Sequence, residues 1–293
     1  MKLSVALLTA VAGSVVARPS TLDVSTLDER LTSRQNDVGH AMVIRANDNP
    51  DNKKNAVNAV LGSEAKKSDG TLFFSTDWAG AVLYPPQQGF YTSITGRFKM
   101  PSVTRAKPAG YQAMDVMLSI DDVSNCPNGG SLEVGVKIKT SKSGATTYEA
   151  WYYFYPNAYG IFKDFPIKVG DVIQMDVTTK TAFSGTVMLT NLSNRKTVSK
   201  DVSGQLGLCR ASAAWVVAHT VTNGKIDPFN NFGTITLSHL SARLNKGAVR
   251  NLNDPSYRYS ILRDDPDGGV PMTHVAYTGP DSLTVQYIGD NPF

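Results

Sequence analysis

The stretch YEAWYYFYP, residues 148–156, decides the fold of this chain, because six of its nine residues are aromatic. Side chains along a β-strand alternate between the two faces of a sheet. Tyr148, Ala150, Tyr152 and Phe154 would share one face, and Glu149, Trp151, Tyr153 and Tyr155 the other. We expect the first face to be core. The second is too aromatic for a solvated surface and carries a carboxylate, so we expect it to line a cleft; the alternative is that it lies under a loop.

Short runs with a period of two residues recur along the rest of the chain, separated by turn residues. They predict strands at FYTSITGRFKM (90–100), AMDVMLSID (113–121), LEVGVKIKT (132–140), VIQMDVTTK (172–180), GTVMLTNL (185–192), AAWVVAHTV (213–221), GTITLSHL (233–240) and SLTVQYIG (282–289). Residues 244–270 are polar and are predicted to form a loop. The strands at close spacing predict an all-β protein, a mostly antiparallel sandwich or a barrel.

The N-terminal sequence predicts secretion. Lys2 precedes a mostly apolar run that ends at Val16, and small residues favour cleavage after Ala17. That run is too short for a membrane anchor, so residues 1–17 are predicted to be a signal peptide. Residues 18–69 carry dibasic pairs at 53–54 and 66–67, and are predicted to be a removed pro-segment or a disordered arm that stays. Residues 70–293 are predicted to be one all-β domain, the alternative being two small ones.

The cysteine count and one sequon also suit an extracellular protein. Cys126 and Cys209 are the two cysteines of the chain, and in an oxidising compartment two cysteines most simply pair. That loop closure would contribute roughly 4.5 kcal/mol on the chain-entropy model; the alternative is two free buried thiols. Asn191 begins the sequon Asn-Leu-Ser in a predicted hairpin turn, where we expect a glycan to be exposed.

Charge and histidine spacing narrow the classes of function. The net charge of +4 is dispersed, without the basic stripe that binds nucleic acid, and no later run is apolar and long enough to enter a membrane. His40, His219, His239 and His274 lack ligand spacing, so we expect neither a metal nor another cofactor. No nucleophile motif supports a Ser-His-Asp triad. We expect a monomer that binds a peptide, a glycan or a small molecule.

Several segments resemble, in the same order, the fungal glutamic peptidases, or eqolisins. They are WAGAVL (78–83), SID (119–121), LEVG (132–135), YEAWYYFYP (148–156), VGDVIQM (169–175), LTNLS (189–193), LCRASAAWVV (208–217) and SLTVQY (282–287). The resemblance covers nearly all of residues 72–289. It implies a two-sheet antiparallel β-sandwich of the concanavalin A-like kind, with a peptide-binding cleft on one sheet. It also implies a disulfide between the loop before LEVG and the cysteine of the LC pair, which fits Cys126 and Cys209.

The resemblance further implies a catalytic dyad, and this sequence departs from it at both positions. In the family a glutamate acts as general base and then as general acid, while a glutamine polarises the carbonyl. Glu133 stands at the position of the glutamine, and Ala218 at that of the glutamate. The methyl group of Ala218 cannot accept a proton, and Glu133 would approach the carbonyl from the wrong side.

The residues around the dyad differ as well. Met117 replaces the family's tryptophan before GID, Lys137 its acidic residue four positions beyond the glutamine, and Tyr153 its glutamate two positions beyond the strand tryptophan. Asp121, Trp151 and Trp78 are retained. The resemblance therefore implies a changed cleft, which Trp78, Met117, Trp151 and Ala218 would line.

Four polar residues are candidates for catalysis or ligand binding: Glu133, Asp121, Lys137 and Tyr153. Strand parity puts Glu133 and Lys137 on one face, roughly 13 Å apart at Cα. Glu133 and Asp121, on neighbouring strands, are the carboxylate pair to consider for glycoside hydrolysis. The alternative is that Glu133 and Lys137 fill an unused cleft as a solvated charge pair.

Three functions stay open at this point. The preferred hypothesis is a secreted pseudo-peptidase that binds a peptide, a glycan or a small metabolite without cleaving it. The second is an enzyme of different acid/base chemistry that acts on a small molecule through Glu133 with Lys137 or Tyr153. The third is an active acid endopeptidase with a rebuilt site, which requires a carboxylate to replace Ala218.

Overall fold

The structure is a computed structural model, and it describes residues 71–289 apart from 85–88, 107–109, 123–125, 127–128, 223–224 and 264–268. The predicted signal peptide, pro-segment and dibasic pairs lie outside the described residues, as does His40. The described residues form strands β1 to β20 and no helix, so none of them belongs to a helix that could cross a bilayer.

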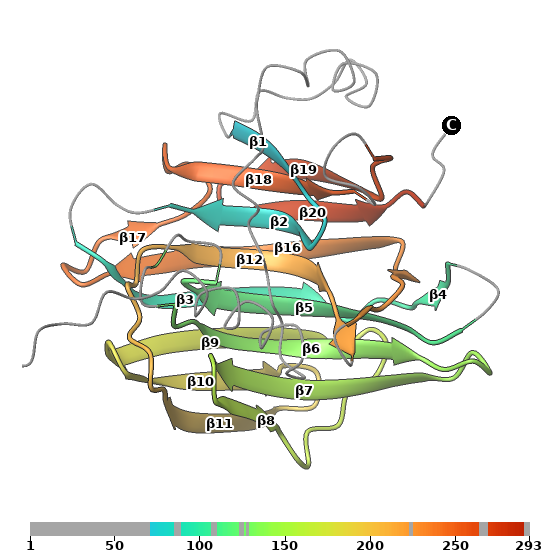
Figure 1. The fold of residues 1–293 in the computed structure, drawn as a ribbon, viewed down its shortest axis with the longest axis horizontal. Coiled ribbons are helices and arrows are strands. Elements are labelled where there is room, and N and C mark those ends of the chain that lie inside the picture. The colour runs from blue at the N-terminus through green and yellow to red at the C-terminus, as the bar shows by residue number, and fades with distance from the viewer. Residues whose placement is uncertain are drawn as a thin grey trace, which may run out of the picture.

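Two large sheets contain most of the strands (Figure 1). Sheet A has the order β1-β18-β2-β12-β5-β6-β7-β8, with β1 (Thr71–Ser75), β18 (Tyr257–Leu262), β2 (Trp78–Leu83), β12 (Ala213–His219), β5 (Gln112–Ile120), β6 (Leu132–Thr140), β7 (Thr146–Phe154) and β8 (Ala158–Ile161). Sheet B has the order β11-β10-β9-β3-β16-β20-β19, with β11 (Lys196–Ser203), β10 (Ser184–Asn191), β9 (Val172–Thr181), β3 (Tyr91–Lys99), β16 (Thr234–Leu244), β20 (Ser282–Tyr287) and β19 (Thr273–Gly279).

Three short pairings complete the strand list. Strand β17 (Val249–Arg250) pairs with β16, β4 (Thr104–Arg105) with β15 (Asn230–Asn231), and β13 (Val221–Thr222) with β14 (Lys225–Ile226). The pairings within the two sheets are antiparallel except that of β1 with β18, which is parallel.

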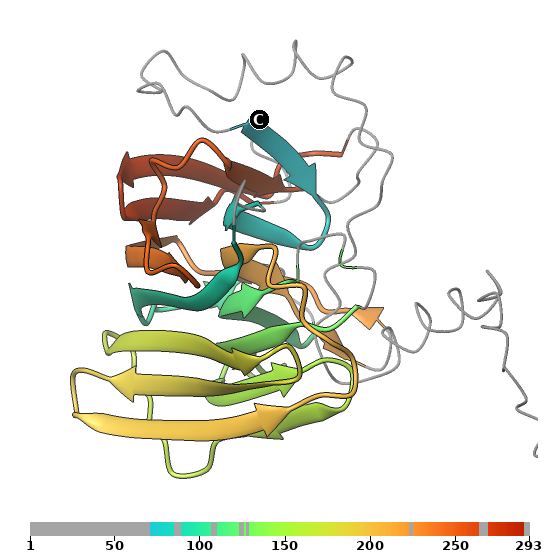
Figure 2. The ribbon, with the colours of Figure 1, turned by 90° about the vertical axis from the view of Figure 1, so that its left-hand side faces the viewer.

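The two sheets stack face to face, as Figure 2 shows, and the main core lies between them. Alternate residues of β6, from Leu132 to Ile138, point into this core and meet residues of β9 such as Met175. The indole of Trp215 on β12 is fully buried, and its Nε1 donates a hydrogen bond to the carbonyl oxygen of Thr95 on β3 (2.7 Å). Gly96 leaves room for this indole, because a Cβ there would lie 2.9 Å from the ring.

The predicted two-sheet sandwich and its eight predicted strands are confirmed. The parity of residues 148–156 is also confirmed, because Ala150 and Phe154 belong to the main core while Trp151 and Tyr153 belong to a separate cluster. The prediction of a loop across residues 244–270 is wrong, because β18 lies inside sheet A between β1 and β2. Strand β18 is buried on both faces, so it lacks the polar alternation that marks a half-buried strand.

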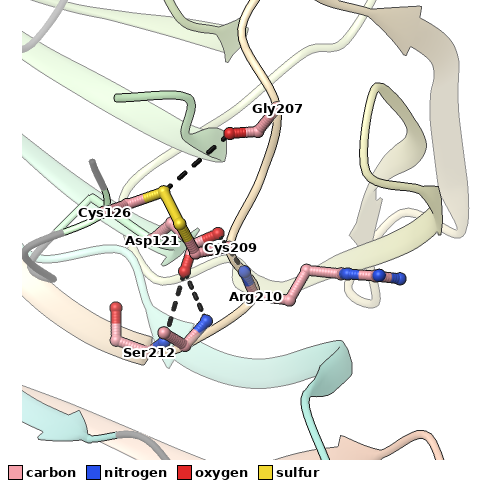
Figure 3. The surroundings of a disulfide bond; sticks show 7 residues. Asp121, Cys126, Gly207, Cys209, Arg210 and Ser212 are labelled. Atoms are coloured by element: carbon pink, nitrogen blue, oxygen red, sulfur yellow. Dashed lines mark hydrogen bonds between the residues drawn. A yellow bond between two sulfur atoms is a disulfide. The ribbon is translucent and has the colours of Figure 1, made fainter. Parts of the chain in front are cut away.

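The predicted disulfide is confirmed: Cys126 and Cys209 are bonded, with their Cα atoms 5.7 Å apart (Figure 3). The same loop is held by Asp121, which follows β5 with a positive φ of 74°. The carboxylate of Asp121 accepts hydrogen bonds from the backbone N–H groups of Arg210, Ala211 (2.6 Å) and Ser212 (3.3 Å) (Figure 3). The disulfide and this carboxylate together fix the segment that leads into β12.

The predicted exposure of the glycan acceptor is wrong. Asn191 ends β10 and its side chain is fully buried. Its Nδ2 donates hydrogen bonds to the carbonyl oxygen of Pro166 (3.1 Å) and to Asp171 (2.7 Å), and its Oδ1 accepts one from the N–H of Ser193 (3.0 Å). The amide that would carry a glycan therefore holds the turn together in the folded chain.

Candidate functional site on the outer face of sheet A

The face of sheet A that points away from sheet B, called here the outer face, carries a second apolar cluster. Its members come from alternate positions of the central strands and from the residue that follows β7: Trp78, Val82, Met117, Trp151, Tyr153, Tyr155, Ala214, Val216 and Ala218. Leu206, from the loop before β12, packs against this cluster. The cluster is buried, so the outer face is not a solvated surface, and a loop residue covers part of it.

The antiparallel register aligns the outer-face residues in three rows that cross β2, β12, β5, β6 and β7. The first row is Trp78, Ala218, Asp115, Lys137 and Glu149. The second row is Gly80, Val216, Met117, Gly135 and Trp151. The third row is Val82, Ala214, Ser119, Glu133 and Tyr153. The rows bring together all the predicted catalytic and cleft residues except Asp121.

The two positions of the expected dyad lie in different rows. Ala218 is in the first row on β12, whereas Glu133 is in the third row on β6, two strands away. Two rows correspond to roughly 13 Å along the strand direction. Glu133 is fully buried, and its Oε1 accepts a hydrogen bond from the hydroxyl of Ser131 (2.5 Å). Glu133 is therefore well separated from the position that Ala218 leaves without a carboxylate.

A buried carboxylate that the sequence analysis missed lies directly beside Ala218. Asp115 on β5 is the cross-strand partner of Ala218 on one side and of Lys137 on the other. Its Oδ1 accepts a hydrogen bond from the indole Nε1 of Trp151 (2.7 Å), and its Oδ2 accepts one from the hydroxyl of Thr220. The signal was present in the sequence, because Asp115 is two residues before Met117 and so shares its face.

Lys137 occupies the middle of β6 and is 3% exposed. Its Nζ lies 5.9 Å from the ring centroid of Tyr159 on β8. Glu133 is buried as well, so the interpretation of Glu133 and Lys137 as a solvated charge pair is wrong. The hydroxyl of Tyr153, opposite Glu133, donates a hydrogen bond to the carbonyl oxygen of Pro156 (3.0 Å) and is therefore engaged with the backbone.

Burial shifts the titration of the groups near the first row. Burial lowers the pKa of His219 to about 4, although a hydrogen bond with the carbonyl of Asp227 opposes this shift. Burial raises the pKa of the Asp227 carboxyl, while the hydroxyl of Thr222 (2.7 Å) and the charge of Lys137 oppose it and the charge of Asp115 adds to it. His219 and Asp227 thus lie in poorly hydrated surroundings at this end of sheet A.

Asp121 stands apart from the rows. Ser119, rather than Asp121, is the cross-strand partner of Glu133, and the carboxylate of Asp121 is directed to the amides of residues 210–212. This environment favours a structural role for Asp121. Within the described ranges, no group of three or more His, Cys, Asp or Glu side chains is arranged to hold a metal ion.

Comparison with known proteins yields one family and several relatives. The model of the family described as Peptidase A4 family matches residues 76–287. The chain is 29% identical to Aspergillopepsin-2 of Aspergillus niger over 245 residues. This alignment covers 77% of this chain and 83% of that protein. It is 40% identical to Scytalidopepsin B of Scytalidium lignicola over 146 residues, and this alignment covers 48% of this chain and 51% of that protein.

Two solved structures share the fold over most of their length. Scytalido-glutamic peptidase in complex with a peptide-based transition state analog aligns with a TM-score of 0.61 and 25% identity, covering 72% of this chain and 98% of that chain. Aspergilloglutamic peptidase from Aspergillus niger aligns with a TM-score of 0.52 and 26% identity, covering 60% of this chain and 99% of that chain. These matches agree with the resemblance seen in the sequence.

Proposed function

Because the chain belongs to the Peptidase A4 family, we propose that it is a secreted member that has lost proteolysis and binds a peptide on the outer face of sheet A. One observation carries this proposal: Ala218, the residue that the resemblance aligns with the family's catalytic glutamate, lies between Trp78 and Asp115 in the first row. An acid/base group must reach the proton that it moves. A methyl group at this position removes both the base and the later acid.

Neither Glu133 nor Tyr153, among the described residues, is placed to take over this role. Glu133 lies two rows and two strands from Ala218, and Ser131 donates a hydrogen bond to it. Tyr153 directs its hydroxyl to a backbone carbonyl. Members of a catalytic pair act as a unit, so the loss of one removes much of what the other supplies. The changes at both dyad positions therefore support a protein without the peptidase reaction.

The choice of a peptide as ligand, and of an extracellular location, rests on separate observations. Scytalido-glutamic peptidase, similar to this chain over most of its length, is described in complex with a peptide-based transition state analog. The outer face here carries the aromatic side chains of Trp78, Trp151 and Tyr153. The disulfide suits an oxidising compartment, and the apolar N-terminal run suits a secretory signal, with residues 18–69 proposed as a pro-segment.

A second candidate function is an acid endopeptidase with a rebuilt site, and Asp115 is the observation that favours it. This carboxylate is the cross-strand neighbour of Ala218 and faces the same way. Two donors, from Trp151 and Thr220, already occupy its oxygens. Donors of this kind stabilise the ionised form, which a general base requires, but they also hold the carboxylate against the sheet. We therefore rank this candidate second.

The test restores the family's residues in steps and measures cleavage of denatured casein between about pH 2 and 4. The single variants Glu133→Gln and Ala218→Glu are matched controls for the double variant, and a four-residue variant adds Lys137→Asp and Tyr153→Glu. We expect no cleavage by the unchanged protein or the single variants, and weak cleavage once both dyad positions are restored. Cleavage by the unchanged protein that is lost in Asp115→Asn would instead establish the second candidate.

A further inference from the structure

Lys137 is a buried cation whose donors are unused. Its side chain is 3% exposed in the middle of β6, and no hydrogen bond or ion pair engages Nζ among the described residues. Removing an ammonium group from water without a partner costs free energy. Among the described residues, Nζ lies 5.9 Å from the ring centroid of Tyr159, and its charge acts on the Asp227 carboxyl. An ammonium group here, without a hydrogen-bond acceptor among the described residues, is suited to an anionic ligand.

The hydroxyl of Tyr159 is a second donor beside Lys137. Its oxygen is buried and has no close hydrogen-bond partner in the described part of the chain, although the side chain of Glu149 lies near enough to act as an acceptor. The ring of Tyr159 is held in place by stacking on Trp151 (centroids 6.2 Å apart) and by an edge contact with Tyr153 (5.9 Å). Burial raises the pKa of Tyr159 further above its ordinary value, and the nearby Glu149 adds to this shift, so the hydroxyl keeps its proton.

The carboxylates around Lys137 are each engaged with other donors. Asp115 accepts hydrogen bonds from Trp151 and Thr220, and Asp227 accepts one from Thr222 (2.7 Å). Glu149 pairs with Lys139 (2.9 Å). None of them lies within ion-pair distance of Lys137 in the described chain. Their combined negative charge would repel a phosphate or another multiply charged group more strongly than a single carboxylate.

We propose that Lys137 and Tyr159 form a subsite for one carboxylate of a bound peptide, either an acidic side chain or the C-terminus. This inference rests on the proposed peptide-binding function and names the feature of the peptide that is recognised. The ammonium and the hydroxyl would donate to the two carboxylate oxygens, which satisfies both donors. A peptide amide at the same place would offer one acceptor and no charge, so it would bind more weakly.

The test compares three probe peptides by isothermal titration calorimetry: acetyl-Ala-Phe-Glu-amide, acetyl-Ala-Phe-Gln-amide, and acetyl-Ala-Phe-Ala with a free C-terminus. We expect the unchanged protein to bind one of the two carboxylate peptides about tenfold more tightly than the Gln peptide. The stronger of the two identifies the source of the carboxylate. The same preference should vanish in Lys137→Met and weaken in Tyr159→Phe.

Lys196→Met is the matched control, because Lys196 is exposed on β11 of sheet B and its loss changes the net charge equally. It should leave the preference unchanged. Equal binding of all three peptides, or a preference that survives Lys137→Met, would contradict the subsite alone. No binding of any peptide would contradict the proposed function and the subsite together.

Discussion

The stability of this protein should fall in acid because of one half-buried histidine, His219. His219 ends β12 next to Ala218, its Nδ1 lies 3.1 Å from the carbonyl oxygen of Asp227, and its ring meets Phe229 edge-on with centroids 4.3 Å apart. Burial lowers its pKa to about 4 from 6.5. The folded chain therefore keeps His219 neutral at a pH where the unfolded chain has already bound a proton.

The size of the effect follows from proton linkage. Because the folded pKa is the lower one, the contribution to stability is complete above about pH 6.5 and is lost as the pH falls towards 4. A single group with these two pKa values costs the folded state about 2 kcal/mol at pH 5 and about 3 kcal/mol at pH 4, relative to pH 7.5. A domain has about 5–15 kcal/mol of stability in total, so this loss is large.

The assay measures the free energy of unfolding in urea at about pH 7.5, 5 and 4 for the unchanged protein and for His219→Gln. Lost ring packing lowers the free energy of unfolding of the variant by a similar amount at each pH. The informative quantity is therefore the difference between the two proteins in how steeply this free energy falls with pH. The variant should lose about 3 kcal/mol less than the unchanged protein between pH 7.5 and pH 4. The partly buried His274, whose pKa is also lowered by burial, stays in both proteins.

His239→Asn is the matched control, because His239 is exposed on β16 and asparagine tolerates its positive φ. This control should keep the slope of the unchanged protein. Parallel pH profiles for the unchanged protein and His219→Gln would refute the reasoning, because they would mean that folded His219 accepts a proton without cost. A fold that loses stability in acid would suit a protein without acid proteolysis.

Two further predictions concern single residues of the scaffold. Gly135→Ala should lower the free energy of unfolding by about 1–3 kcal/mol. Its Cβ would lie 2.8 Å from Met117 Cβ, from Trp151 Cζ2 and from the carbonyl oxygen of Val116. Gly279→Ala is the matched control and should change this free energy little, because a Cβ there meets nothing within 4 Å. Asn191→Ala should lower the free energy of unfolding by about 2 kcal/mol, because it removes four hydrogen bonds of the turn after β10. Urea denaturation measures both, and an unchanged midpoint for either variant would contradict the packing or the hydrogen bonding described.

The strands and their faces could be predicted from the sequence because period-two patterning survives wherever one face meets the core. Residues 148–156 show this well, since their rings divide between the main core and the outer face. Strand β18 could not be predicted, because its neighbours bury both of its faces and the polar alternation is lost. The edge strand β11 was missed for the opposite reason, since nearly all of its residues are exposed or half-buried.

The sequence could predict which residues belong to the candidate site, but not how these residues are arranged relative to one another. Parity placed Glu133 and Lys137 on one face, and the outer face of sheet A carries both. The cross-strand register, which puts Asp115 between Ala218 and Lys137, depends on how β12, β5 and β6 align, and local patterns do not fix that alignment. Burial of Lys137 without a partner is likewise a property of the assembled sheet.

The central claim is that the protein does not cleave peptide bonds, and one measurement tests it most directly. The purified domain of residues 70–293 is incubated with denatured protein between about pH 2 and 7, and mass spectrometry records any new peptides. We predict no cleavage above that of a sample without the protein, at any pH where the domain stays folded. Peptides that accumulate with time, and that disappear when Glu133→Ala or Asp115→Asn replaces the unchanged domain, would contradict this account.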